Sequence, residues 1–300
     1  MKKVVSIIAL LVVIVALLGV NGLLVYNAIS SRNQEVKNPV LSLEVEGYGN
    51  VKIELYPEYA PNTVKNIIAL ANNGYYNGKI FYGMDDIAVY VGRDANGESD
   101  NPTIGDIDKS VVKTEENAET NSAETNNTET AETPENTVEP INEDDYKYEI
   151  DGEFVANNFR KNTLKHEKGV VSLVRADYTK QMQSLTKESY NSGSSQFTIV
   201  MEDNNGLNGM YAGFGKVIEG MDIVEKIYGL EIKKEETTEE STTTTETTEE
   251  SIKPFAAAPV IKTATVETYG VTYGLPKVHE AFDYSGYLQQ LLNQYYNTSN

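Results

Sequence analysis

The side chains that most often carry nucleophilic or metal-assisted chemistry are scarce in this chain. Its 300 residues include no cysteine, which excludes disulfides, thiolate zinc sites, thiol catalysis and a lipid-modified cysteine. The only histidines are His166 and His279, too few for a His-rich metal site. We therefore expect no metal and no cofactor.

Carboxylates are abundant, but their spacing indicates solvated tracts. The 45 Asp and Glu against 25 Lys and Arg give a formal net charge of −20, which argues against nucleic acid as a partner because binding phosphates needs a basic face. Residues 113–145 and 235–252 are rich in Glu and Thr and poor in apolar side chains, so we expect disordered acidic inserts. Neither has the D-x-D-x-D-G spacing of a calcium loop.

Residues 1–26 have the composition of a membrane segment. Lys2 and Lys3 precede the uncharged stretch Val4–Tyr26, which is long enough as a helix to cross a hydrocarbon core of about 30 Å. The basic start favours a cytoplasmic N-terminus. We expect a single-pass anchor in the cell membrane, a juxtamembrane spacer over 27–38 and an extracytoplasmic domain. A cleaved signal peptide, giving a secreted protein, is the alternative, although no clean A-x-A site follows.

A folded domain is expected over 39–275. Alternating apolar residues on both sides of the Gly47–Asn50 turn predict a β-hairpin. From Pro61 to Gly74 the apolar period changes to that of an amphipathic helix. Further strands are expected at Gly169–Val174, Phe197–Met201, Phe214–Ile218 and Val260–Tyr269. A second helix is expected over Met221–Tyr228, and an amphipathic C-terminal helix over Val278–Tyr296 occupies the last segment, 276–300. Many short strands with two helices indicate a mainly β barrel or sandwich.

Several segments resemble the cyclophilins, in the order in which that family has them. They are Ile53–Asn66, Gly74–Phe81, Asp151–Phe154, Leu164–Ser172, Asn191–Phe197, Leu207–Met221 and Ile261–Val266. The resemblance implies an eight-stranded antiparallel barrel capped by two helices. It also implies peptidyl-prolyl cis-trans isomerase activity on a proline-containing peptide or an exported protein client.

In that family an arginine donates a hydrogen bond toward the prolyl nitrogen, and an apolar pocket grips the proline ring. Rotation about the X–Pro bond must overcome amide resonance, a barrier of about 18–20 kcal/mol, so catalysis rests on binding the twisted state. The family's F-H-R pattern aligns with Phe81–Gly83, which puts Gly83 at the arginine position. The expected activity is therefore weak.

The resemblance also places the peptide-binding positions, several of which depart from the family pattern. Ala88, Val89 and Val91 replace the aromatic, the methionine and the glutamine of one pocket wall, Thr198 replaces a phenylalanine, and Gly206 replaces another aromatic. The residues that retain the pattern or fall at main-chain contacts are Val174, Arg175, Gln196, Leu207 and Tyr211.

Arg93 is a speculative substitute for the missing arginine. It lies two residues beyond Val91, and we expect both on the same face of the strand. Three functions stay open: an extracytoplasmic isomerase that assists the folding of exported proteins, a catalytically inactive module that binds peptides or a protein, and a structural surface protein. A prolyl isomerisation assay separates the first from the others.

Overall fold

The computed structural model describes residues 37–97, 101–108, 147–233 and 252–298. The chain divides into two units, residues 1–37 and residues 38–300, and the account below concerns the second. The predicted anchor over 1–26, most of the spacer and the acidic tracts 113–145 and 235–251 lie outside the described residues. Within the described ranges, no helix has the length and apolar character needed to cross a bilayer.

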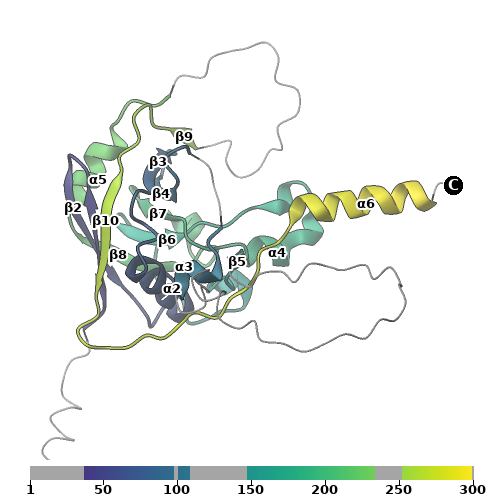
Figure 1. Cartoon of the computed structure of the whole chain (residues 1–300), viewed down its shortest axis with the longest axis horizontal. Coiled ribbons are helices and arrows are strands. Elements are labelled where there is room, and N and C mark those ends of the chain that lie inside the picture. Colours follow the sequence, from purple (N-terminus) through teal and green to yellow (C-terminus); the bar gives the residue numbers. More distant parts are fainter. Residues whose placement is uncertain (1–36, 98–100, 109–146, 234–251, 299–300) are drawn as a thin grey trace, which may run out of the picture. The chain divides into compact units, whose positions relative to one another are not determined.

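The described unit is built on one antiparallel sheet of nine strands (Figure 1). The order of the strands across the sheet is β10-β1-β2-β8-β6-β7-β4-β3-β9. The strands are β1 (Val40–Val45), β2 (Gly49–Leu55), β3 (Ile80–Met84), β4 (Ala88–Arg93), β6 (Val170–Leu173), β7 (Phe197–Val200), β8 (Gly213–Glu219), β9 (Lys253–Pro254) and β10 (Ile261–Glu267). The short β9 makes the count nine, where eight were predicted.

The sheet is curled, because backbone hydrogen bonds join β10, at one end, to β3, the strand next to the other end. The start of β3 bonds to the residues that lead into β10: Gly78 N donates to Ile261 O at 2.8 Å, and Phe81 N donates to Pro259 O at 2.9 Å. An isolated bridge joins Ile80 to Val260. The prediction of a mainly β, curled antiparallel sheet is confirmed.

Two amphipathic helices pack against different parts of this sheet (Figure 1). Helix α2 (Pro61–Asn72) buries Ile67 and Leu70 in the core, and α5 (Met221–Tyr228) buries Val224. The N-terminus of α2 has no cap from its own Ala60. The side chain of Glu153 serves instead, accepting hydrogen bonds from Asn62 N at 2.9 Å and from Thr63 N and Oγ1 at 2.8 Å.

The remaining elements flank the sheet. They are α3 (Ile104–Ile107), α4 (Thr186–Tyr190), the 3-10 turns η3 (Val155–Asn157), η4 (Tyr178–Lys180), η5 (Gln183–Leu185) and η6 (Asn205–Leu207), and a separate two-stranded sheet of β5 (Tyr148–Glu149) and β11 (His279–Glu280). Since β11 pairs with β5, the chain after Val278 is extended where a helix was predicted.

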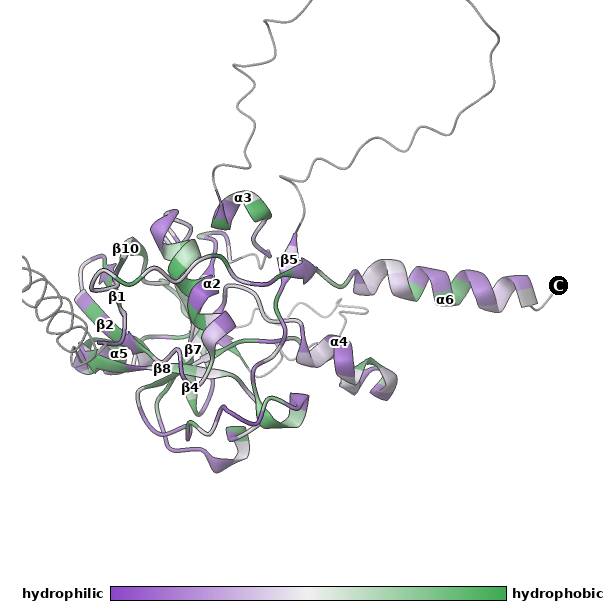
Figure 2. Cartoon of the chain, turned by 90° about the horizontal axis from the view of Figure 1, so that it is seen from below, coloured by the Kyte–Doolittle hydropathy of each residue, from purple (hydrophilic) through white to green (hydrophobic). Residues whose placement is uncertain are grey.

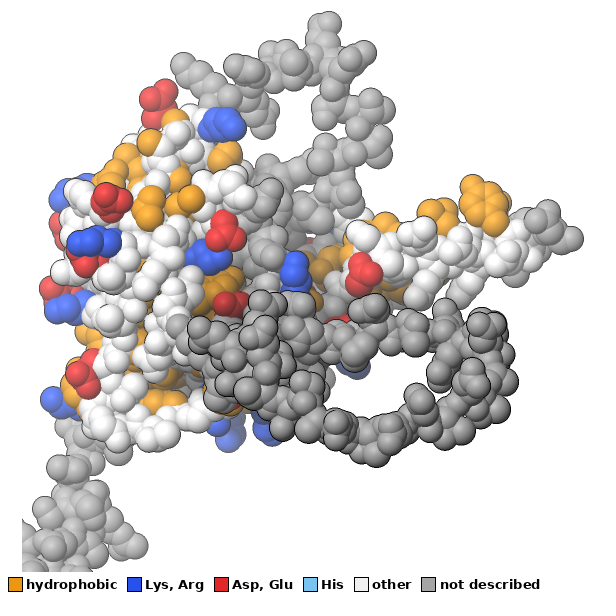
Figure 3. Space-filling model, in the orientation of Figure 1, with side chains coloured by type: hydrophobic (Ala, Val, Ile, Leu, Met, Phe, Trp, Pro, Cys, Tyr) orange, Lys and Arg blue, Asp and Glu red, His pale blue; other side chains and the backbone are white. Residues whose placement is uncertain are grey.

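The C-terminal helix, α6 (Tyr284–Thr298), therefore begins later than predicted and reaches away from the sheet (Figure 1). Hydrophobic and hydrophilic residues alternate along it (Figure 2). Its first turn is held by aromatic contacts, because Tyr178 stacks on Tyr284 with ring centroids 5.1 Å apart. Farther along, Leu292 and Tyr295 are exposed, and hydrophobic side chains of α6 lie on the surface in Figure 3.

Candidate functional site

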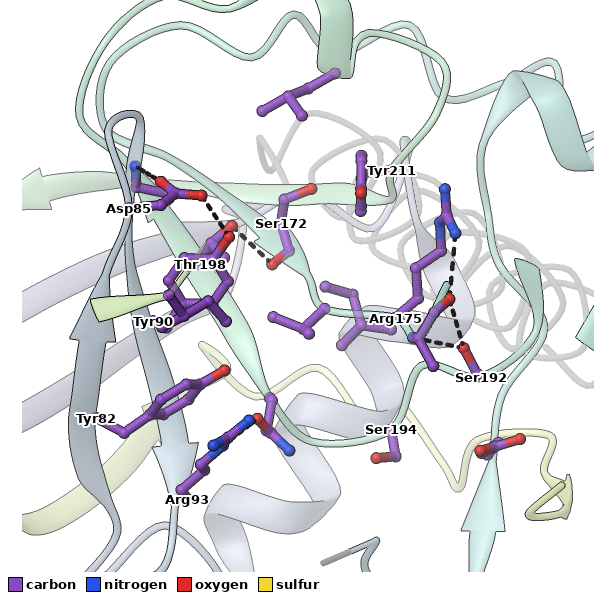
Figure 4. Close-up of a pocket in the computed structure, with 18 of the residues that line it drawn as sticks. Tyr82, Asp85, Tyr90, Arg93, Ser172, Arg175, Ser192, Ser194, Thr198 and Tyr211 are labelled. Atoms are coloured by element: carbon purple, nitrogen blue, oxygen red, sulfur yellow. Dashed lines mark hydrogen bonds between the residues drawn. The ribbon is translucent and has the colours of Figure 1, made fainter. Parts of the chain in front are cut away.

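A cavity of about 370 Å³ lies on the outer side of strands β4, β6 and β7, and we call it the first cavity (Figure 4). It collects eight of the twelve site residues predicted from the sequence: Ala88, Arg93, Val174, Arg175, Gln196, Thr198, Leu207 and Tyr211. Gly83, Val89, Val91 and Gly206 do not line it. Most of the residues predicted from the alignment therefore lie around one cavity, and the others lie outside its lining.

Val89 and Val91 were predicted to bind peptide, and that prediction is wrong. Both side chains are fully buried in the hydrophobic core. Successive side chains of a strand point to opposite faces, so Ala88 and Tyr90 face the first cavity while Val89 and Val91 face inward.

Gly83 lies in β3 opposite Pro254 of β9. A Cβ atom at this position would lie 2.7 Å from the backbone oxygen of Lys253 and 2.9 Å from Cγ2 of Ile252. Such distances are shorter than side-chain carbons adopt without a shift of the neighbour, and here the nearest neighbour is backbone. At residue 83, where the family pattern has its arginine, β9 thus leaves no room for a side chain.

Ile252 was predicted to end the second acidic insert, but the structure places it on the wall of the first cavity, next to β9. The residues after the insert thus belong to the site. They take the space beside Gly83 that an arginine side chain would need.

Arg93 reaches the first cavity for a different reason from the one predicted. It does not share a face with Val91, because the pairing of β3 with β4 skips a residue between Ile80↔Arg93 and Phe81↔Val91. The skipped residue is Gly92, with φ of 115°, a conformation that favours glycine. This irregularity turns Arg93 to the same side as Ala88 and Tyr90.

The guanidinium of Arg93 is held beside a predicted peptide-binding residue. Its central carbon lies 4.1 Å from the centre of the Tyr82 ring, within the range of a cation–π contact. Its Nε donates to Gln196 Oε1 at 3.4 Å, and its Nη1 donates to the Gly97 carbonyl at 3.5 Å. A permanent cation therefore stands at the edge of the cavity, next to Gln196 (Figure 4).

The neighbouring wall is fixed by the turn between β3 and β4. Asp85 Oδ1 accepts from the backbone N–H groups of Ile87 at 2.9 Å and Ala88 at 2.7 Å, and its Oδ2 accepts from Tyr90 OH at 2.7 Å. Burial, together with the Asp85 charge, raises the pKa of Tyr90, so its hydroxyl stays a neutral donor. Tyr82 and Tyr90, 5.8 Å apart between ring centroids, supply aromatic surface on the wall where Ala88 has none.

A second arginine stands across the cavity (Figure 4). The Arg175 guanidinium carbon lies 4.6 Å from the centre of the Tyr211 ring, and its Nε donates to Met210 O at 3.3 Å. The strand beneath is anchored by Val174 N, which donates to Gln196 O at 2.9 Å. Tyr211, Arg175 and Gln196 thus form one connected wall.

The far end of the cavity was not predicted from the sequence. It is built by residues from four separate segments: Asn101, Glu149, Tyr178, and Ser192 with Ser194. Glu149 accepts from Asn101 Nδ2 at 3.2 Å and from Phe282 N at 3.1 Å, and burial raises its pKa. No spacing in the sequence relates these segments, since one follows the first insert and another lies in the stretch before the Asn191–Phe197 motif.

Comparison with known proteins agrees with this architecture. The model of the cyclophilin type peptidyl-prolyl cis-trans isomerase family matches residues 40–249, which is more than half of the chain. This chain belongs to the cyclophilin-type peptidyl-prolyl cis-trans isomerase family.

Individual relatives are distant. A peptidyl-prolyl cis-trans isomerase of Acinetobacter baylyi is 29% identical over 60% of this chain and 66% of its own length, so the chain spans slightly less than two thirds of that relative. Peptidyl-prolyl cis-trans isomerase B of Bacillus subtilis is 27% identical over 64% of this chain and 92% of its own. A Cryptosporidium parvum cyclophilin, crystallised in the presence of the dipeptide Ala-Pro, covers 76% of this chain and 98% of its own at 19% identity, with a TM-score of 0.46.

Proposed function

We propose that this protein is a weak peptidyl-prolyl cis-trans isomerase in which Arg93 supplies the cationic donor. The observation that carries the proposal is the position of the Arg93 guanidinium, inside the first cavity, over Tyr82 and beside Gln196. Family membership supports the reaction type.

The arrangement suits rotation about an X–Pro bond. A proline ring can pack against the aromatic faces and Leu207, while Gln196 and the Val174 strand hold the adjoining backbone. Arg93 would then donate toward the prolyl nitrogen as that atom becomes pyramidal and accepts a hydrogen bond. This favours the twisted state over both planar isomers and needs no covalent step.

The activity is expected to be weak because the arginine approaches from a different strand. Its hydrogen bonds to Gln196 and to the Gly97 carbonyl are 3.4 Å and 3.5 Å long, beyond the usual 2.7–3.2 Å of a strong N–H···O bond, so the guanidinium is not tightly fixed. The wall is also less confining, with Ala88 and Thr198 where the family carries large rings. Loss of contact with one large side chain costs roughly 1–3 kcal/mol of binding.

The test is prolyl isomerisation of a chromogenic test peptide by the full chain in detergent micelles. Replacing Arg93 by Gln should lower kcat/KM by about 10²–10³, the usual cost of removing one preorganised donor. Arg160→Gln removes an exposed arginine that does not line the cavity and serves as the matched control. Unchanged activity in Arg93→Gln would refute the role of Arg93.

A second candidate is a binding module without catalysis. The small side chains Ala88 and Thr198 favour it, because they leave the proline ring with fewer contacts that distinguish the twisted state. It predicts that proline peptides bind to the full chain, as measured by calorimetry, without any acceleration of isomerisation.

We further propose that the curled sheet forms the closed barrel of the family, and that this is a single-pass membrane protein whose domain lies outside the cytoplasm and acts on exported proteins. The support for the location is the uncharged stretch Val4–Tyr26 after Lys2 and Lys3. In cell fractionation the protein should be found with the membranes. Protease added to intact cells should digest the domain. Release of a shortened chain into the medium would favour a cleaved signal peptide instead.

A further inference from the structure

A second cavity, of about 670 Å³, adjoins the first. Its walls are mostly apolar and come from Ile80, Ile232, Pro254, Phe255, Ala256 and Ala258. Three charged side chains also line it: Arg93, Glu231 and Lys233. The apolar side chains suit an uncharged, apolar ligand group.

The second cavity is built by the two chain segments on either side of the second acidic insert. Lys233 N donates to Pro254 O at 2.7 Å, and Ala256 N donates to Glu231 O at 2.8 Å. An isolated bridge pairs Ile232 with Phe255. These bonds hold the two segments together as a platform beside β3, and Ile232 remains 37% exposed there.

The two cavities share part of their lining. Tyr82, Arg93 and Ile252 line both of them. A peptide that passes over these residues would place one residue in the first cavity and a nearby residue in the second, because an extended chain advances about 3.3 Å per residue.

We propose that the second cavity binds an apolar side chain of the same peptide whose proline occupies the first cavity. This inference rests on the proposed function, in that it requires the first cavity to hold proline. The ligand is then an extended peptide with one proline and one aliphatic residue a short distance away. The apolar walls would remove that side chain from water.

The test measures binding of alanine-based peptides to the full chain by calorimetry. The parent peptide has one central proline, and each derivative carries one leucine at a different flanking position. One position should bind about tenfold more tightly, which corresponds to ~1.4 kcal/mol and to burial of part of a leucine side chain. Equal binding of all proline peptides would overturn this inference and leave the proposed function standing.

Two neighbouring alanines provide matched variants. Ala256 and Ala257 are both exposed, but only Ala256 lines the second cavity. Ala256→Glu should abolish the tenfold gain from leucine and leave binding of the parent peptide unchanged, whereas Ala257→Glu should preserve both. Persistence of the gain in Ala256→Glu would overturn the assignment. Failure of every proline peptide to bind would overturn the proposed function together with this inference.

Discussion

Restoring the family arginine by Gly83→Arg should damage this protein and leave its activity no higher. The Cβ atom alone would lie 2.7 Å from the Lys253 carbonyl oxygen, whereas carbon–oxygen contacts in proteins are usually about 3.3 Å or longer. Strand β9 would therefore have to move by about 0.6 Å. Overpacking of this kind typically costs about 1–3 kcal/mol, and for a domain of this size each kcal/mol lowers Tm by roughly 2–4 °C.

Thermal unfolding and prolyl isomerisation of three variants separate the effect of the steric clash at residue 83 from the effect of adding an arginine. Gly83→Ala adds only the clashing atom and should account for most of the loss of stability. Ala257→Arg adds an arginine at an exposed position that does not line either cavity and should be neutral. Adding Ile252→Ala to Gly83→Arg should not rescue stability, because the closest clash is with backbone. A stable Gly83→Arg protein with isomerisation as fast as ordinary relatives would refute this reasoning.

Three further predictions concern stability and ligand binding. Glu153→Gln should destabilise the protein by about 2–3 kcal/mol, seen as a lower denaturant midpoint, because it removes a carboxylate that caps the buried start of α2; an unchanged midpoint would contradict the capping role. Burial lowers the pKa of His166 in the folded state. The contribution of this neutral side chain to the free energy of unfolding is therefore full above the pKa of histidine in the unfolded chain, about 6.5, and is lost as pH falls below it. The fall in Tm between neutral and mildly acidic pH should shrink in His166→Gln and persist in His279→Gln. Thr198→Phe should tighten binding of a proline peptide about tenfold in a calorimetric titration, since an added ring contact contributes about 0.5–1.5 kcal/mol beyond area burial; weaker binding would show that the cavity has no room for the ring.

Periodicity was a good guide to the sheet and to its two packed helices. The alternation before and after Gly47 predicted β1 and β2, and Met221–Tyr228 coincides with α5. Periodicity failed after Val278, where apolar residues at helical spacing predicted a helix but the chain forms the short strand β11. There the pairing of His279 and Glu280 with β5 outweighs local preference, as tertiary contacts often do.

The site was only partly predictable, because strand alternation breaks at Gly92. Counting by twos from Val91 puts Arg93 in the core, while the irregular pairing with β3 puts it in the cavity. The position of Ile252 beside β3 could not be predicted from spacing either, because the second acidic insert separates it from the preceding predicted elements. The pattern thus named Gln196, Tyr211 and Arg93, all of which line the cavity, and missed Tyr82, Tyr90 and Ile252.

The loss of one arginine and the placement of another follow from a single feature of the fold. Once β9 pairs with β3, the backbone of Lys253 fills the volume next to residue 83, and glycine is the residue that fits. The cation at this edge of the cavity, Arg93, comes instead from the neighbouring strand, β4, where the pairing with β3 is irregular. Gly92 supplies the irregularity: a Cβ there would lie 3.2 Å from the Gln196 Cα, so a larger residue would push Gln196 away from Arg93. Gly83 and Gly92 are therefore two positions at which a side chain would displace a neighbour, and the irregularity at Gly92 sets the side of β4 on which Arg93 lies.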